Sequence, residues 1–130
     1  MATSVGLVVD DDTELRLLLA QALRRGGLRV LEAGSGREAL RLAQTSAPDF
    51  VVTDIGMPGL DGVELCRRLR QLPATSKVPI VIVTGSAVTQ AHEATAAGCD
   101  VVLPKPCSPA LLLATIQRLL VPSSESTRKQ

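Results

Sequence analysis

The stretch VVTDIGMPGLDG, residues 51 to 62, joins a buried-strand pattern to an abrupt break in the chain. It begins as a β-branched apolar run, which is typical of a strand inside a protein. The run ends at a carboxylate, Asp54, and glycines and a proline follow at once (Gly56, Pro58, Gly59 and Gly62). A lone carboxylate at the end of a buried strand needs a physical reason, and the rest of the chain supplies candidates for it.

Strand and helix patterns alternate along the whole chain. Short apolar runs predict five strands, at residues 6–9, 28–33, 49–54, 79–84 and 100–104. Apolar residues at helical spacing predict five helices, at 12–27, 35–44, 61–72, 87–98 and 108–120. Three of these helices begin at capping residues, which are Ser35, Asp61 and Ser108.

This alternation predicts an α/β fold, a doubly wound open sheet of five parallel strands with right-handed crossovers. The strands at 6–9, 51–53 and 80–83 are apolar throughout, as expected where helices cover both faces of a sheet. The chain of 130 residues is predicted to form one domain over residues 1–121. The polar end, residues 122–130, is predicted to be a flexible tail.

Composition narrows the possible partners and the compartment. A net charge of +1 gives no electrostatic argument for binding nucleic acid or a membrane surface. Phe50 is the only aromatic residue, so stacking platforms for single-stranded nucleic acid are absent from the sequence. The three cysteines have no CxxC spacing, and we interpret them as reduced packing residues of a cytoplasmic protein (Cys66, Cys99 and Cys107).

Chemically useful side chains follow several of the predicted strands. Asp10 and Asp11 follow the first, Asp54 ends the third, Thr84 ends the fourth, and Lys105 follows the fifth. In open α/β sheets the carboxyl ends of the strands line the binding crevice, so we expect these groups to converge. Three carboxylates would repel one another there, and one lysine offsets only one charge. Hard carboxylate oxygens without histidine or cysteine favour Mg²⁺ as the remaining counter-charge.

A carboxylate nucleophile, a divalent metal, a lysine and a hydroxyl are the parts that form and hold an aspartyl phosphate. Four motifs stand in an informative order, LVVDDD, VVTDIGMPGLDG, VIVTGS and LPKP. With this order and spacing, the chain over residues 5 to 120 resembles the receiver domain of two-component response regulators, of the stand-alone type. The resemblance implies a flavodoxin-like fold with strand order 2-1-3-4-5.

The resemblance also implies a metal site. Asp11 is implied as a direct Mg²⁺ ligand, Asp10 as its water-bridged partner, and the backbone carbonyl of Gly56 as a further ligand. Asp54, also beside the metal, is implied as the phosphoacceptor.

Two further residues receive roles from the same resemblance. Thr84 is implied as the hydroxyl that meets the phosphoryl group, and Lys105 as the lysine that contacts the acceptor carboxylate, with a cis peptide bond to Pro106. The phosphoryl donor would be a histidine kinase or a histidine phosphotransfer protein. The resemblance implies a phosphoacceptor protein and not an enzyme, because such a chain catalyses only its own phosphorylation and dephosphorylation.

Two departures concern how a signal leaves the domain. Receivers usually carry an aromatic residue where this chain has Val102, and a phenylalanine where it has Cys107. The surrounding segment is rich in apolar residues that cannot all be buried, so we expect the 86–120 face to bind an unidentified downstream protein. These departures also motivate an alternative, a receiver-fold interaction module that works without phosphorylation.

Plainer interpretations remain beside these. Asp12 is expected to cap the following helix, and the arginines at 67, 68 and 70 are expected to form a solvated helix face. His92 is expected to be a surface or packing residue. The pattern Gly34-x-Gly36-x-x-Ala39 could suggest a dinucleotide site, but it would follow an edge strand away from the crevice. A phosphatase of the haloacid dehalogenase type needs an aspartate where Gly56 stands.

Overall fold

The protein forms one five-stranded parallel sheet flanked by helices, in a computed structural model that describes residues 3–85 and 88–121. The strands are β1 (Val5–Val9), β2 (Arg29–Ala33), β3 (Phe50–Thr53), β4 (Ile80–Thr84) and β5 (Val101–Pro104). The helices are α1 (Thr13–Arg25), α2 (Gly36–Ser46), α3 (Gly62–Gln71), α4 (Val88–Ala96) and α5 (Pro109–Leu119). The strand order β2-β1-β3-β4-β5 confirms the predicted flavodoxin-like topology.

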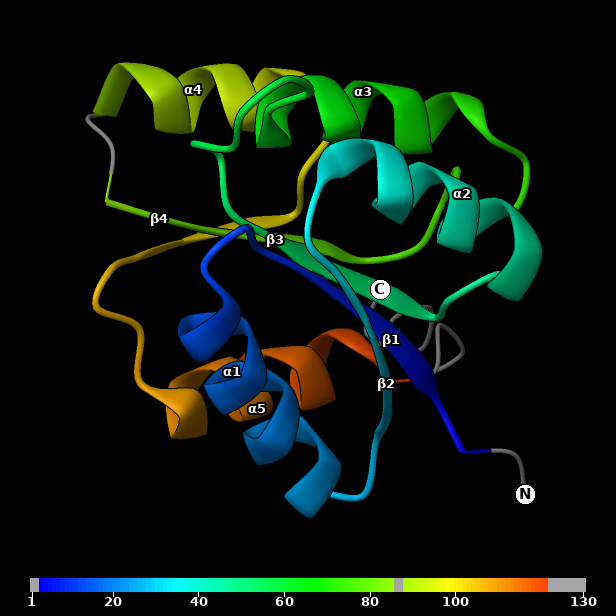
Figure 1. The fold of residues 1–130 in the computed structure, drawn as a ribbon, viewed down its shortest axis with the longest axis vertical. Helices are drawn as coiled ribbons and strands as arrows, with labels where there is room; N and C mark the ends of the chain where they lie inside the picture. Colours follow the sequence, from blue (N-terminus) through cyan, green and yellow to red (C-terminus); the bar gives the residue numbers. More distant parts are fainter. Residues whose placement is uncertain (1–2, 86–87, 122–130) are drawn as a thin grey trace, which may run out of the picture.

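The helices form two layers around the sheet. In Figure 1, α1 and α5 lie on one side of the strands and α2, α3 and α4 lie on the other. Side chains of each strand alternate between the two layers, so Leu7 and Val9 pack towards α2–α4 while Val8 packs towards α1 and α5. Because both faces are covered, β1, β3 and β4 are buried almost throughout, as their continuous apolar runs predicted.

The single aromatic residue has a matched position in the sheet. Phe50 is fully buried, and a Cβ added at Gly6 on the neighbouring strand would lie only 1.9 Å from its ring. Gly6 is paired with Phe50 in the β1–β3 register. The glycine therefore leaves the space that the ring occupies, in a core that is otherwise aliphatic.

The predicted element boundaries are correct to within two residues. Each strand boundary differs by one residue or less, and α2 extends two residues beyond its prediction, to Ser46. Ala47 caps the C-terminal end of α2 and adopts a left-handed conformation with φ 45°. The predicted tail at 122–130 and the first two residues of the predicted 86–120 face, 86 and 87, lie outside the described residues. Among the residues that are described, no helix has the length and apolar character to cross a membrane.

The capping predictions are confirmed at the level of single hydrogen bonds. The side chains of Asp12, Ser35, Asp61 and Ser108 each accept from the backbone N–H three residues on. In a full capping box, the glutamate three residues after the cap would also accept from the N–H of the capping residue. Here Glu38 accepts instead from the N–H of Gly34, one residue before Ser35.

One prediction about side-chain exposure was wrong. Arg70 does not belong to a solvated face, because it donates to the carbonyls of Gly98, Thr75 and Val78 and pairs with Asp100. It ties the end of α3 to two loops. On α5, the buried residues are Leu112, Thr115 and Ile116.

Candidate functional site

The predicted site residues meet at one edge of the sheet. Asp10 directly follows β1, Asp54 directly follows β3, and Lys105 directly follows β5. β1 and β3 are neighbours, and all five strands are parallel, so their carboxyl ends open on the same side. The strand order thus places residues more than 90 positions apart in the chain in one crevice, as from Asp10 to Lys105.

Three carboxylates cluster in this crevice. One carboxylate oxygen from each of Asp10, Asp11 and Asp54 lies within 4.8 Å of the other two. Asp10 is only 3% exposed, Asp54 is half-buried and Asp11 is exposed. Three negative charges in so small and partly dry a volume call for counter-charge, and oxygen donors of this kind suit Mg²⁺. The donor set therefore fits the metal that the sequence predicted.

Lys105 supplies one positive charge to the cluster. Its Nζ donates to Oδ2 of Asp54 at 2.9 Å and lies 3.7 Å from Oδ2 of Asp10, with 27% of the side chain exposed. Burial by itself would lower the pKa of Lys105, but the hydrogen bond to Asp54 and the charge of Asp10 outweigh it and raise that pKa. The lysine is therefore held as a cation against the two acids.

Asp10 carries the electrostatic cost of the arrangement. Burial raises the pKa of Asp10, and the hydrogen bond from the Asp12 N–H and the charge of Lys105 offset this only in part. The neighbouring charges of Asp54 and Asp11 raise the pKa further. The crevice thus holds an acid whose ionised form is disfavoured, which is the environment that a bound cation would relieve.

The loop after Asp54 is shaped by close backbone contacts. The N–H of Ile55 donates to Oδ1 of Asp54 at 2.7 Å, and the N–H of Gly62 donates to the carbonyl of Ile55 at 2.9 Å. A Cβ added at Gly62 would lie 2.0 Å from the carbonyl oxygen of Asp54. Only glycine permits α3 to begin so close to Asp54, a requirement that the sequence by itself did not indicate.

The other glycines of this loop differ in what they require. Gly59 has φ 76°, which fits the predicted sharp turn. A Cβ added at Gly56 would meet nothing within 4 Å. Steric crowding therefore does not explain Gly56, and the role predicted for its carbonyl as a metal ligand stays a prediction.

Thr84 lies beside Pro104 and Lys105 at the end of β5. It is the last residue of β4, it is 4% exposed, and it pairs in register with Pro104. Its carbonyl accepts from the N–H of Lys105 at 2.9 Å. The fold thus places Thr84 at the predicted strand end. The peptide bond between Lys105 and Pro106 is cis, as the resemblance implied.

A hollow of about 450 Å³ borders the crevice on the α1 side. It is mostly apolar and is lined by Leu15, Leu18, Val83, Lys105, Pro106 and Cys107. Leu18 is 52% exposed. Cys107 is half-buried, so the prediction of a packing role holds in full only for Cys66 and Cys99, which are buried.

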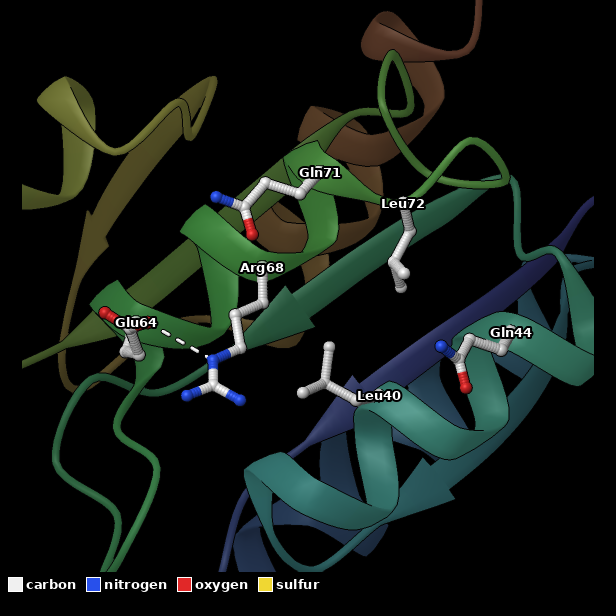
Figure 2. A pocket seen from close by; sticks show the side chains of 6 residues that line it. All are labelled: Leu40, Gln44, Glu64, Arg68, Gln71 and Leu72. Atoms are coloured by element: carbon white, nitrogen blue, oxygen red, sulfur yellow. Dashed lines mark hydrogen bonds and ion pairs between the residues drawn. The ribbon is translucent and has the colours of Figure 1, made fainter.

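A second hollow, also about 450 Å³, lies away from the acids, between α2 and α3. Figure 2 shows Leu40 and Gln44 of α2 facing Arg68 and Leu72 across it. Its charged groups pair with each other on α3, where Glu64 accepts from Arg68 at 3.2 Å. This hollow brings together no group that the sequence analysis had assigned to the site.

The glycines of the apparent dinucleotide motif have packing roles. β2 is an edge strand, as the rejection of that motif required. A Cβ added at Gly36 would lie 2.7 Å from the carbonyl oxygen of Leu60. One added at Gly34 would lie 3.1 Å from a guanidinium nitrogen of Arg16. Both glycines make room for neighbours on the protein itself.

Comparisons with known proteins identify the family of this chain. Residues 7–117 match the family model described as response regulator receiver domain. Response regulator MprA of Mycolicibacterium vanbaalenii is 43% identical over 88% of the chain and 49% of its own length. The transcriptional regulatory protein PhoP of Bacillus subtilis, named for alkaline phosphatase synthesis, is 36% identical over 92% of the chain and 52% of its own length.

Solved structures give the same result. Chemotaxis protein CheY4 of Vibrio cholerae has a TM-score of 0.87 and 33% identity, over 92% of this chain and 100% of that one. A CheY-like receiver domain protein of Methanospirillum hungatei has a TM-score of 0.87 and 26% identity, over 99% of this chain and 100% of that one. The chain spans about half the length of the relatives MprA and PhoP. It belongs to the response regulator receiver domain family.

Proposed function

We propose that Asp54 accepts a phosphoryl group from a phosphohistidine and that the phosphorylated protein acts by binding another protein. The observation that carries this proposal is the position of Asp54, with one oxygen on Lys105 and with Asp10 and Asp11 beside it. Membership of the receiver family supports it. The chain catalyses only its own phosphorylation and dephosphorylation in this scheme.

The chemistry follows from charge and position. An oxygen of Asp54 attacks the phosphorus atom, and the phosphorus–nitrogen bond of the donor breaks, with its electron pair leaving on the imidazole. Lys105 already touches Asp54, so its ammonium stands where negative charge gathers on the transferred group. Asp10, Asp11, Asp54 and the carbonyl of Gly56 would hold Mg²⁺. When bound, the metal supplies charge neutralisation for the phosphoryl oxygens.

The partners are proposed from the same geometry. A donor protein must bring its histidine to Asp54, and the apolar hollow lined by Leu15, Leu18 and Cys107 borders that approach. A histidine kinase or histidine phosphotransfer protein that covers this hollow would also exclude water from the reaction. The downstream partner is proposed to bind the 86–120 face, in whose described part Leu111 is 49% exposed and β5 is only half-buried.

A second candidate function is a receiver-fold interaction module that works without phosphorylation. Val102 and Cys107 favour it, because both stand where the family usually has aromatic residues that couple the site to the surface. Val102 is half-buried and packs against the α2–α4 core cluster. The candidate keeps the fold and the surface but gives Asp54 no role in signalling.

Intact-mass measurements after incubation with a small phosphodonor and Mg²⁺ distinguish the two candidates. We expect one phosphoryl adduct on the wild type and none on Asp54→Asn. Asp61→Asn is the matched control, because Asp61 is an exposed aspartate of the same loop and asparagine caps a helix equally well. No adduct on the wild type would leave the interaction module as the function, and an adduct that persists on Asp54→Asn would assign the acceptor elsewhere. Rapid, repeated release of phosphate would indicate a phosphatase.

A further inference from the structure

Arg16 contacts the acid loop, which we define as residues 10–12 after β1, but the sequence assigned it no role. It lies in the first turns of α1, and its Nη1 donates to the backbone carbonyl of Asp10 at 2.9 Å. Its side chain is only 18% exposed. An arginine buried to this degree is held by specific partners, and here one partner is the backbone of a predicted metal ligand.

The other side of the guanidinium is anchored on the edge strand. Arg16 Nε donates to Oε1 of Glu32 at 3.1 Å, and Arg24 Nη1 lies 3.2 Å from Oε2 of the same carboxylate. Glu32 pairs with Val8 in the β1–β2 register, two residues before Asp10. The edge strand thus holds the arginine, and the arginine holds the end of β1.

The contact acts on the peptide unit between Asp10 and Asp11. Because a peptide unit is planar, fixing the carbonyl of Asp10 fixes the direction from which Asp11 extends. On the other side of Asp11, the N–H of Asp12 donates to Oδ1 of Asp10 at 2.9 Å. Within residues 3–85 and 88–121, no hydrogen bond or ion pair of the protein holds the side chain of Asp11 itself. Its placement therefore depends on these backbone contacts.

We propose that Arg16, anchored by Glu32, is a positioning residue that holds Asp10 and Asp11 in the orientation needed to bind Mg²⁺. The proposal rests on the proposed function, since it concerns the metal site assigned there. Gly34 belongs to the same device, because a Cβ at that position would lie 3.1 Å from the guanidinium. The device therefore joins residues of α1, of β2 and of the turn after β2 to the acid loop.

Geometry, rather than charge, is what Arg16 contributes. A positive charge so close to a cation site would by itself repel Mg²⁺, and Glu32 offsets that charge. The planar guanidinium reaches a carboxylate with Nε and a carbonyl with Nη1 at the same time, and a lysine ammonium has no such fixed fork. Arg16→Lys, which keeps the charge and loses the fork, separates the two effects.

The test measures Mg²⁺ affinity by calorimetric titration and, in parallel, the urea midpoint of the metal-free protein. Arg16→Lys and Arg16→Met are expected to bind Mg²⁺ about tenfold more weakly than the wild type, a loss typical of residues that orient metal ligands. Arg24→Met is the matched control. Arg24 pairs with the same glutamate but donates to the carbonyl of Val30, so its loss should lower stability and leave the Mg²⁺ affinity unchanged.

The outcomes separate this proposal from the proposed function. A wild type that binds no Mg²⁺ overturns both. A wild type that binds Mg²⁺ while both Arg16 variants bind it equally well, or more tightly, overturns the positioning role alone. Equal losses in Arg16→Met and Arg24→Met also overturn it, because they would indicate a general effect of stability. Should Arg16→Met fail to fold, Arg16→Lys and Glu32→Gln answer the same question.

Discussion

Two regions of this molecule gather charged side chains next to a hollow, and they treat those charges in opposite ways. In the crevice at the strand ends, burial raises the pKa of Asp10, and Lys105 compensates the acids only in part. Beside the second hollow, between α2 and α3, hydrogen bonds from Arg68 and Arg67 lower the pKa of the exposed Glu64. The ionised form of Asp10 is therefore disfavoured, whereas the ionised form of Glu64 is stabilised by its neighbours.

The difference shows how a functional site can be told from a charged surface. Glu64 finds its partners three and four residues along one helix, so its pairing is local and open to solvent. The crevice acids follow two different strands, and Asp10 and Asp54 share one lysine, so the fold itself forces them together. Unbalanced charge that the tertiary structure imposes, rather than charge as such, marks the candidate site.

The largest effect is expected at the floor of the crevice. Gly62→Val would place a Cβ 2.0 Å from the carbonyl oxygen of Asp54, and a backbone atom cannot move aside easily. We expect a loss of more than about 3 kcal/mol in the free energy of unfolding, measured by urea denaturation. Gly56→Ala is the control, because its new Cβ meets nothing within 4 Å, and its stability should stay within about 0.5 kcal/mol of the wild type. Similar stabilities for the two variants would contradict the close approach.

A smaller effect is expected from α3, where neighbouring arginines differ. Arg70→Met removes hydrogen bonds to the carbonyls of Gly98 and Val78 together with the pair to Asp100, and should cost about 2 kcal/mol. Arg68→Met removes one exposed pair and should cost less than about 0.5 kcal/mol. Thermal unfolding of the two variants side by side provides the measurement. Equal midpoints would mean that α3 holds its charges as a uniform solvated face.

The smallest effects test the signs of the two carboxylates in metal-free protein. A raised pKa means that the folded state binds the proton of Asp10 more tightly, so its destabilising effect is absent below the ordinary value of 3.8 and complete above the folded pKa. Asp10→Asn should therefore raise the thermal midpoint by a few degrees at neutral pH and not in strong acid.

Glu64→Gln is the corresponding variant at the hollow between α2 and α3. A lowered pKa means that the contribution of Glu64 is present above its ordinary value of 4.5 and is lost as the pH falls through the folded pKa. The variant should thus be slightly less stable than the wild type at neutral pH, with the difference vanishing in acid. Thermal unfolding of both variants across pH provides the measurement. A shift of the midpoint in the same direction for Asp10→Asn and Glu64→Gln would contradict the opposite signs of the two pKa shifts.

Local features of the fold were open to prediction from the chain. Asp12 and Ser108 were identified as caps because a cap contacts a backbone N–H only three residues on. The convergence of Asp54 and Lys105 was also predicted, since the carboxyl ends of parallel strands meet at one edge. In contrast, Arg70 reaches a carbonyl 28 residues away, and no spacing in the sequence indicates that partner.

Arg16 and Gly62 make the same point within the candidate site. Both lie near residues that the sequence singled out, yet their contacts depend on how an edge strand and a loop pass beside them. The amino-acid sequence determined the order of strands and helices, their caps and the kinds of group at each strand end, because periodicity and capping act over a few residues. Only the packed molecule decided which side chains hold Asp10 and Asp11 in place, because those contacts join segments that the sequence keeps apart.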